Sequence, residues 1–228
     1  MMSLQQLAAM IDVSAVRADS NRNDVQKTAT LARQQHCVAA FALPAFTAEL
    51  IELLNGVTDT VVGGVVGFPS GAETTATKMF QAKELTQLGC AEIDMVMNIG
   101  QFLSEQFTKV ETDIHSVKQT IGSTPLKVIL ECNYLSPDQI KTASEIAVRA
   151  GADWVKTGTG WVAGGTTVEQ VQLMKQTVGN AARVKAAGGV SSLDILLKLH
   201  NAGAERFGIG YKKAKEILTE YQENPTRN

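Results

Sequence analysis

Two lysines stand in short apolar runs, where a strand entering a protein core would ordinarily carry another valine or isoleucine. Lys156 follows Trp154 and Val155 in "GADWVKTGTG", and Lys185 follows Val184 in "RVKAAGG". A buried ammonium without a partner tends to lose its proton, and a neighbouring positive charge has the same effect. A primary amine attacks a carbonyl only when unprotonated, whereas an ordinary lysine, with a pKa of about 10.4, is almost fully protonated at neutral pH. The two lysines therefore indicate Schiff-base chemistry.

The elements that must position these side chains alternate regularly along the chain. Short apolar runs predict eight strands, and amphipathic patterns predict helices between them. The predicted strands cover residues 10–14, 38–43, 60–68, 92–98, 126–131, 153–158, 183–188 and 206–210. The clearest helical patterns cover residues 22–36, 74–89, 136–151, 166–179 and 191–203, and several of them close on Gly.

This alternation favours one fold of the α/β class. Strands that are almost continuously apolar are typical of a parallel sheet that is covered on both faces or closed on itself. Eight strand–helix units in 228 residues fit a closed (β/α)8 TIM barrel better than an open Rossmann sheet, because no GxGxxG motif follows the first strand. We expect a single domain over residues 1–228, with a loose polar tail at about 221–228.

In such a barrel the chemistry belongs at the carboxyl ends of the strands. Because side chains alternate along a strand, Lys156 and Asp94 are expected to point into the barrel, with Lys185 on the same side in the adjacent strand. Asp94 would then transfer protons at the carbinolamine and at the substrate carbon. Read alone, Asp94 could equally cap a loop or pair with an arginine. A single strand lysine more often extends to solvent, and we expect this of Lys127, which starts its strand at the barrel floor.

The last two strands end in glycine-rich turns, "AAGGV" and "GIG". Backbone amides at this end of a barrel can hold a phosphate, although glycine serves any tight turn equally well. We therefore expect substrate-binding residues at the strand ends and an anion site near the last two turns. The candidate substrate-binding residues are Asp12, Thr157, Gly160, Gly188, Gly189, Gly208 and Gly210.

Composition limits the partners of the chain. The 23 acidic residues nearly balance the 21 basic ones, so no broad charge attracts nucleic acid or a membrane surface, and a small-molecule partner is expected. The three cysteines form no CxxC spacing, which argues against a disulfide framework and for a cytoplasmic location. The start "MMSLQQLAAMID" lacks the pattern of a signal peptide, and no apolar run approaches the roughly 18 residues of a membrane span.

The histidines do not predict a metal site. His36, His115 and His200 all fall in helical or helix-end segments away from the predicted strand ends, and the chain has no HxH or HExxH spacing. We therefore expect catalysis by an organic amine, without a metal and without another cofactor.

Five motifs occur in register with those of a known enzyme family. They are "VVGFPSGAETTATKMFQAKELTQLGCAEIDMVMNIG", "LKVILE", "AGADWVKTGTG", "VKAAGGV" and "AGAERFGIG", in unbroken order over about residues 60–210. This stretch resembles the deoxyribose-phosphate aldolases, class I aldolases that split 2-deoxyribose 5-phosphate into glyceraldehyde 3-phosphate and acetaldehyde. The resemblance implies a TIM barrel without metal or organic cofactor that often forms homodimers. It also implies that Lys156 is the Schiff-base lysine, that Lys185 tunes it, and that Asp94 belongs to the proton relay.

The chain departs from the family pattern at the expected phosphate end. Gly158 stands at a serine of the family's "KTSTGF", and Trp161 follows where an aromatic residue or a lysine is usual. Ser191 stands where the family commonly has an arginine, and Gly210 and Tyr211 replace a serine-rich turn. Each hydrogen bond lost with these groups costs about 1 to 3 kcal/mol. These departures predict a phosphate grip that is weaker, differently placed or absent.

The first strands depart from the family as well. "IDVSAV" stands for "IDHTLL", which keeps Asp12 and a hydroxyl at Ser14, and "FALP" stands for "CVNP", which introduces Phe41 and Leu43. We expect the catalytic groups of the family together with altered substrate-recognition residues. The chain is thus expected to be a deoxyribose-phosphate aldolase or a close variant. Two alternatives stay open: a Schiff-base lyase acting on a different or non-phosphorylated sugar or keto acid, and a non-catalytic phosphosugar-binding paralogue. A phosphosugar isomerase is disfavoured, because its usual glutamate base needs no paired lysines.

Overall fold

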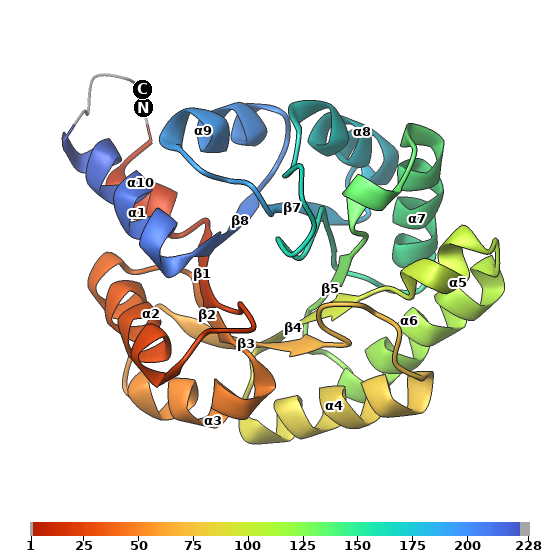
Figure 1. Cartoon of the computed structure of the whole chain (residues 1–228), viewed down its shortest axis with the longest axis horizontal. Coiled ribbons are helices and arrows are strands. Elements are labelled where there is room, and N and C mark those ends of the chain that lie inside the picture. The colour runs from red at the N-terminus through yellow and green to blue at the C-terminus, as the bar shows by residue number, and fades with distance from the viewer. Residues whose placement is uncertain (1, 224–228) are drawn as a thin grey trace.

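Eight parallel strands close into a barrel in chain order, with β8 paired to β1 (Figure 1). The structure, a computed structural model, describes residues 2–223. Its strands are β1 (Ile11–Ala15), β2 (Ala39–Ala42), β3 (Val61–Val66), β4 (Glu92–Val96), β5 (Leu126–Ile129), β6 (Trp154–Lys156), β7 (Arg183–Ala187) and β8 (Arg206–Gly210). Each strand overlaps the run predicted for it, and the closed order confirms the TIM-barrel prediction.

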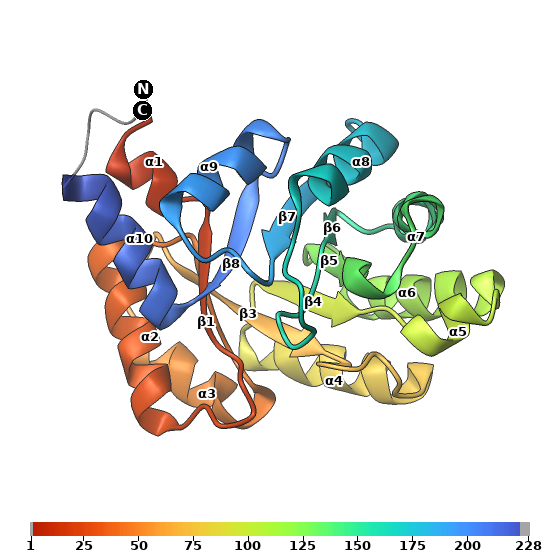
Figure 2. The same cartoon turned by 45° about the horizontal axis from the view of Figure 1, so that its top comes forward.

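Helices form a ring around the outside of the barrel (Figures 1 and 2). The long helices are α2 (Arg22–Gln35), α3 (Pro44–Leu53), α4 (Thr75–Leu88), α6 (Phe107–Ile121), α7 (Pro137–Arg149), α8 (Val168–Val178), α9 (Leu193–Asn201) and α10 (Tyr211–Glu223). The shorter elements are α1 (Leu4–Ala8), α5 (Ile99–Leu103) and the 3-10 turn η1 (Cys132–Tyr134). Local signals account for the ends: Ser136 and Gln139 form a capping box before α7, and Gly89 ends α4 in a left-handed conformation.

The two sides of the barrel wall bury different kinds of side chain. Ile93 and Val155 face outward and belong to the main apolar core between strands and helices. Inside the barrel the apolar cluster is small, and consists of Ala39, Phe41 and Val65. This small cluster leaves much of the interior to charged side chains.

Strand register brings the inward-facing charges to the same level. Lys156 on β6 stands beside Lys185 on β7, and Asp94 on β4 stands beside Lys127 on β5. Residues that are paired in a parallel ladder point to the same face of the sheet. All four side chains are buried, and they therefore share the barrel interior.

The C-terminal segment differs from the sequence prediction. Residues 221–223 are the last turn of α10, and Tyr221 is buried, with its hydroxyl donating to the carbonyl oxygen of Met2 at 2.5 Å. The prediction of a loose tail is wrong for residues 221–223, because the amphipathic face of α10 packs against α1. Residues 224–228 lie outside the described residues. Between residues 2 and 223, no helix combines the length and hydrophobicity needed to cross a membrane.

Candidate active site

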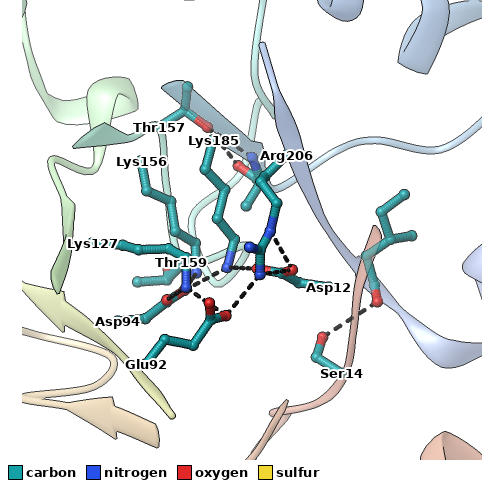
Figure 3. Close-up of polar contacts among 12 residues, drawn as sticks. Asp12, Ser14, Glu92, Asp94, Lys127, Lys156, Thr157, Thr159, Lys185 and Arg206 are labelled. Carbon is teal, nitrogen blue, oxygen red and sulfur yellow. Dashed lines mark hydrogen bonds and ion pairs between the residues drawn. The ribbon is translucent and has the colours of Figure 1, made fainter. Parts of the chain in front are cut away.

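Lys156, Lys185 and Asp94 meet inside the barrel (Figure 3). The Nζ atom of Lys156 lies 2.7 Å from Oδ2 of Asp94, and the Nζ atom of Lys185 lies 2.6 Å from the same oxygen. Asp94 reaches both lysines from β4, across the barrel interior, because β6 and β7 carry the two lysines in register. One carboxylate oxygen thus receives hydrogen bonds from two amines.

Further ion pairs extend this group across the floor of the barrel. Asp12 lies 2.5 Å from Lys185 Nζ and 2.5 Å from Arg206 Nη2. Arg206 also lies 2.7 Å from Glu92, and Glu92 lies 2.5 Å from Lys127 Nζ. We call the whole set the charge cluster; its members are Asp12, Glu92, Asp94, Lys127, Lys156, Lys185 and Arg206.

Lys127 is placed differently from the sequence prediction. It was expected to extend to solvent, but its side chain is 0% exposed and lies between Glu92 and Asp94, at 2.5 and 3.1 Å. The prediction is wrong because β4 supplies two inward carboxylates next to the strand that carries Lys127. The ring of Phe41, whose centre is 5.3 Å from Nζ, faces the same ammonium.

The charge cluster has one more basic group than it has acids. Four basic side chains minus three carboxylates leave a net charge of +1 when every group is ionised. Lys127, Lys185 and Arg206 each contact two carboxylates, whereas Lys156 contacts Asp94 alone. Lys156 is therefore the basic group whose charge the cluster stabilises least, and its deprotonation makes the cluster neutral.

The pKa shifts follow this imbalance. Burial, together with the charge of Lys185, lowers the pKa of Lys156 from 10.5 to about 8, against the attraction of Asp94. Burial also acts on Lys185, but Asp12 and Asp94 outweigh it and raise the pKa of Lys185. Burial disfavours the ionised form of Asp94, yet the three surrounding lysines hold its pKa well below 3.8. One lysine thus has an accessible neutral form beside a lysine that stays charged.

The two carboxylate oxygens of Asp94 have different contacts. Oδ2 accepts directed hydrogen bonds from Lys156 and Lys185. Oδ1 forms an ion pair with Lys127 at 3.1 Å that lacks hydrogen-bond geometry. Protons therefore have a direct path only between Oδ2 and the two lysines that it joins.

A small inner pocket lies beside the Nζ atom of Lys156. Its volume is about 30 Å³, and its apolar walls include Phe41, Val65 and Phe68. Because a buried water needs roughly 10–15 Å³ of such space, the pocket has room for about two waters. Asp12, a predicted substrate-binding residue, lines this pocket and forms ion pairs with Lys185 and Arg206.

A second cavity, which we call the mouth pocket, opens next to the inner pocket. Its volume is about 290 Å³, and it shares Ser14, Val16, Thr159 and Gly208 with the inner pocket. The predicted substrate-binding residues that line the mouth pocket are Gly160, Gly188, Gly189, Gly208 and Gly210. The structure thus brings five of the seven predicted binding residues to one cavity beside Lys156.

Thr157 is placed apart from both pockets. Its hydroxyl donates to the carbonyl oxygen of Ala187 at 2.9 Å, lies 2.7 Å from the hydroxyl of Thr166, and accepts from the amide of Ala187 at 2.9 Å. These bonds join the loop after β6 to the end of β7. Thr157 therefore holds the strand that carries Lys156 and lines neither pocket.

Glu131 organises the loop that follows Lys156. It has a left-handed backbone with φ 56°, and its buried carboxylate accepts from the amide of Thr159 at 3.1 Å and from the Thr159 hydroxyl at 2.5 Å. A Cβ atom on Gly158 would lie 2.6 Å from Oε1 of Glu131. Glycine at position 158 thus leaves space for this carboxylate, which fixes Thr159 at the boundary between the two pockets.

Sequence reasoning missed Glu92 and Arg206 as members of the charge cluster. The signal for Glu92 was present, because it precedes Asp94 by two positions in "EIDMV", and side chains two apart on a strand share a face. Arg206 begins β8 and carries no comparable local sign. In the part of the chain that the structure describes, no group of three or more His, Cys, Asp and Glu side chains is arranged to hold a metal ion.

Comparisons with known proteins agree with this geometry. Residues 7–214 match the family model described as DeoC/LacD family aldolase. A deoxyribose-phosphate aldolase from Rhizobium meliloti (strain 1021) is 42% identical over 212 residues, which are 93% of this chain and 86% of that one. The structure described as "QR15, an Aldolase" has a TM-score of 0.90 at 29% identity, over 99% of this chain and 98% of the other. The tetrameric deoxyribose phosphate aldolase from Aeropyrum pernix has a TM-score of 0.87 at 26% identity, over 96% and 92%.

Proposed function

Because the chain belongs to the DeoC/LacD family of aldolases, we propose that it cleaves 2-deoxyribose 5-phosphate into glyceraldehyde 3-phosphate and acetaldehyde by class I, metal-independent chemistry. The observation that carries this proposal is the buried amine of Lys156, whose pKa is lowered to about 8 beside Lys185. At neutral pH roughly one molecule in ten then holds the neutral amine, compared with about one in a few thousand for an ordinary lysine.

The first step joins enzyme and substrate. The neutral amine of Lys156 attacks the C1 aldehyde of the open-chain sugar, and Oδ2 of Asp94 accepts the proton that the nitrogen releases. The same carboxylate, hydrogen-bonded to the Lys185 ammonium, passes that proton to the alkoxide oxygen, which becomes the carbinolamine hydroxyl. A second proton, drawn from solvent through Oδ2, then lets the hydroxyl leave as water. The product is a protonated Schiff base on Lys156.

The second step breaks the C2–C3 bond of the sugar. The C3 hydroxyl loses its proton to Oδ2 of Asp94 and becomes the aldehyde of glyceraldehyde 3-phosphate, while the electron pair of the C2–C3 bond moves into an enamine on Lys156. The proton held on Asp94 is then available for C2. Protonation of C2 and hydrolysis of the Schiff base then release acetaldehyde and restore the amine. The carboxylate of Asp94, which lies 2.7 Å from Lys156 Nζ and 2.6 Å from Lys185 Nζ, offsets the positive charge that forms on the Schiff-base nitrogen.

The inner pocket supports a small aldehyde as the donor fragment. Acetaldehyde has three non-hydrogen atoms, and the space beside Lys156 is about 30 Å³ between Phe41 and Phe68. A keto acid would bring a carboxylate next to that of Asp94. The pKa of Asp94 is held well below its usual value, so its carboxylate is negative and would repel the keto acid. The geometry therefore favours an aldehyde over a keto acid among the reactions open to a Schiff-base lyase.

We propose a small phosphorylated sugar as the partner and the cytoplasm as the location. Assembly into a homodimer remains a prediction, and light scattering of the purified protein after size-exclusion chromatography tests it.

Reductive trapping tests the proposed function. Incubation with acetaldehyde and borohydride is expected to replace one hydrogen on Lys156 by an ethyl group, and peptide mass spectrometry locates it. The Lys156→Ala variant is the control and is expected to stay unmodified at that peptide. An unchanged mass of the native protein after this treatment would identify a non-catalytic binding protein instead.

A further inference from the structure

Two basic side chains line the mouth pocket. They are Arg17 and Lys213, and the other lining residues among those described are neutral. Lys213 also forms an exposed ion pair with Glu216 in α10, so Arg17 is the principal cation of this cavity. Ser191, in the turn after β7, contributes a hydroxyl and no charge. A cavity with two cations and exposed backbone is suited to an anionic group.

The guanidinium of Arg17 is held in place although it lies at the surface. Its Nη1 donates to the carbonyl oxygen of Gly160 at 3.2 Å, and its Cζ atom lies 5.3 Å from the ring centroid of Trp161. The indole of Trp161 is fixed in turn by a 2.9 Å hydrogen bond from its Nε1 to the carbonyl oxygen of Val16. The hydrogen bond to Gly160 uses one of the five donors of Arg17, so the fork remains able to bind an anion.

Backbone conformation and packing favour glycine at three positions of the mouth pocket, independently of any ligand. Gly160, Gly188 and Gly189 have φ values of 80°, 85° and 77°. A Cβ atom on Gly189 would lie 2.6 Å from the Cα atom of Gly165, and one on Gly188 would lie 3.2 Å from the Cα atom of Gly160. The loops after β6 and β7 thus pack backbone against backbone, and charge recognition in this cavity falls to the side chains.

The mouth pocket adjoins the reacting carbon through the four residues that both pockets share. A ligand with its carbonyl carbon at Lys156 therefore extends past Thr159 and Gly208 toward Arg17. We propose that Arg17, assisted by Lys213, binds the phosphate of the acceptor half of the substrate and so determines the preference for a phosphorylated sugar. This inference rests on the proposed function and names two binding residues that the sequence motifs did not indicate.

Substrate discrimination tests the proposal. The quantity is the ratio of kcat/KM for 2-deoxyribose 5-phosphate to kcat/KM for 2-deoxyribose, measured in the native protein and in Arg17→Gln, Arg17→Lys and Lys213→Gln. Loss of a charge-assisted pair is expected to lower the ratio about 10- to 100-fold in Arg17→Gln, with a smaller fall in the other two. Lys212→Gln is the matched control: Lys212 lies in the same first turn of α10, over the ring of Tyr211 and outside the mouth pocket, so its ratio should not change.

Direct binding provides a readout that does not require turnover. Titration of the protein with inorganic phosphate is expected to change the fluorescence of Trp161, which stacks on Arg17, and to do so far more weakly in Arg17→Gln. A native ratio near one, or an equal fall of both kcat/KM values in Arg17→Gln, would overturn the proposal. Trapping of acetaldehyde on Lys156 needs no phosphate, so its success alongside either of those results shows that the proposed function stands while this inference fails.

Discussion

Lys156 and Lys185 donate to one oxygen of one carboxylate, Oδ2 of Asp94, at 2.7 and 2.6 Å. The two amines share the same negative charge. The protonated form of Lys185 is stabilised more, because Lys185 Nζ also lies 2.5 Å from the carboxylate of Asp12. The proton is therefore lost first from Lys156, which lines the inner pocket together with Lys185. The reactivity of one lysine thus depends on how firmly its neighbour is held.

Replacement of Lys185 tests this dependence. In Lys185→Gln burial still lowers the pKa of Lys156, but the positive charge that adds to this effect is gone, and Asp94 keeps its attraction for the remaining ammonium. The pKa of Lys156 is expected to rise above 8, so the acidic limb of the kcat/KM profile should move to higher pH and kcat/KM at pH 7 should fall at least about 10-fold. A pH profile of retro-aldol cleavage measures both effects, and an unmoved limb would show that Lys185 does not tune Lys156.

The lowered pKa of Lys156 also has a consequence for stability. Below pH 8 the native and unfolded states both carry the proton, and the full destabilisation by the buried charge is present. Between pH 8 and 10.5 the unfolded state holds more protons than the native state, so stability should rise with pH over that window. Lys156→Met is therefore expected to be more stable than the native protein at pH 7, by about 1 to 3 kcal/mol, and to lose this advantage toward pH 10.5. Urea unfolding at several pH values measures the difference.

Lys127 is expected to behave in the opposite way. Lys127→Met leaves Glu92 and Asp94 buried with one cation fewer, and this should cost about 3 to 5 kcal/mol of unfolding free energy. Lys141→Met is the control, because Lys141 forms only an exposed ion pair with Asp138 at 3.5 Å, and its effect should stay within about 0.5 kcal/mol. Equal stabilities of the two variants in urea would contradict the buried position of Lys127.

Replacement of Gly158 by a larger residue is expected to be destabilising. A Cβ atom there would meet Oε1 of Glu131 at 2.6 Å, so Gly158→Ser should displace the carboxylate from Thr159 and lower both stability and turnover, with a stability loss of about 1 to 3 kcal/mol. Gly100→Ser is the matched control, since the nearest atom to its Cβ would be Oδ1 of Asn98 at 3.8 Å. Thermal unfolding and retro-aldol rates of both variants check this, and a Gly158→Ser protein with native values of both would refute the role of Glu131.

The sequence predicted the barrel and the facing of its two catalytic candidates because both depend on local patterns. Period-two alternation at the ends of apolar strands was enough to place Lys156 and Asp94 inside the barrel. The same local reasoning failed for Lys127, since its environment is determined by Glu92 and Asp94 on the neighbouring strand. Its position at the start of a strand indicated a solvent-facing group, but a pair of buried carboxylates stabilises an ammonium there instead.

Loop chemistry was harder to predict than strand chemistry. The placement of Arg17 beside Trp161 joins residues 144 positions apart, and no motif in the sequence connects them. Thr157 was predicted to bind substrate from its place after Lys156, but its hydroxyl is occupied by Ala187 and Thr166. The glycines predicted to bind substrate line the mouth pocket, and backbone packing between two loops explains them without a ligand.

The most direct test of the central claim is the pKa of Lys156 itself. The rate at which a small amine-selective reagent modifies Lys156 is followed by peptide mass spectrometry from pH 6 to pH 11, with exposed Lys141 as the internal standard. The charge cluster predicts a midpoint near 8 for Lys156, well below the value of about 10.4 that is usual for a lysine. A midpoint for Lys156 at about 10.4 would contradict this prediction, because the amine would then be no more available for Schiff-base formation than an ordinary lysine.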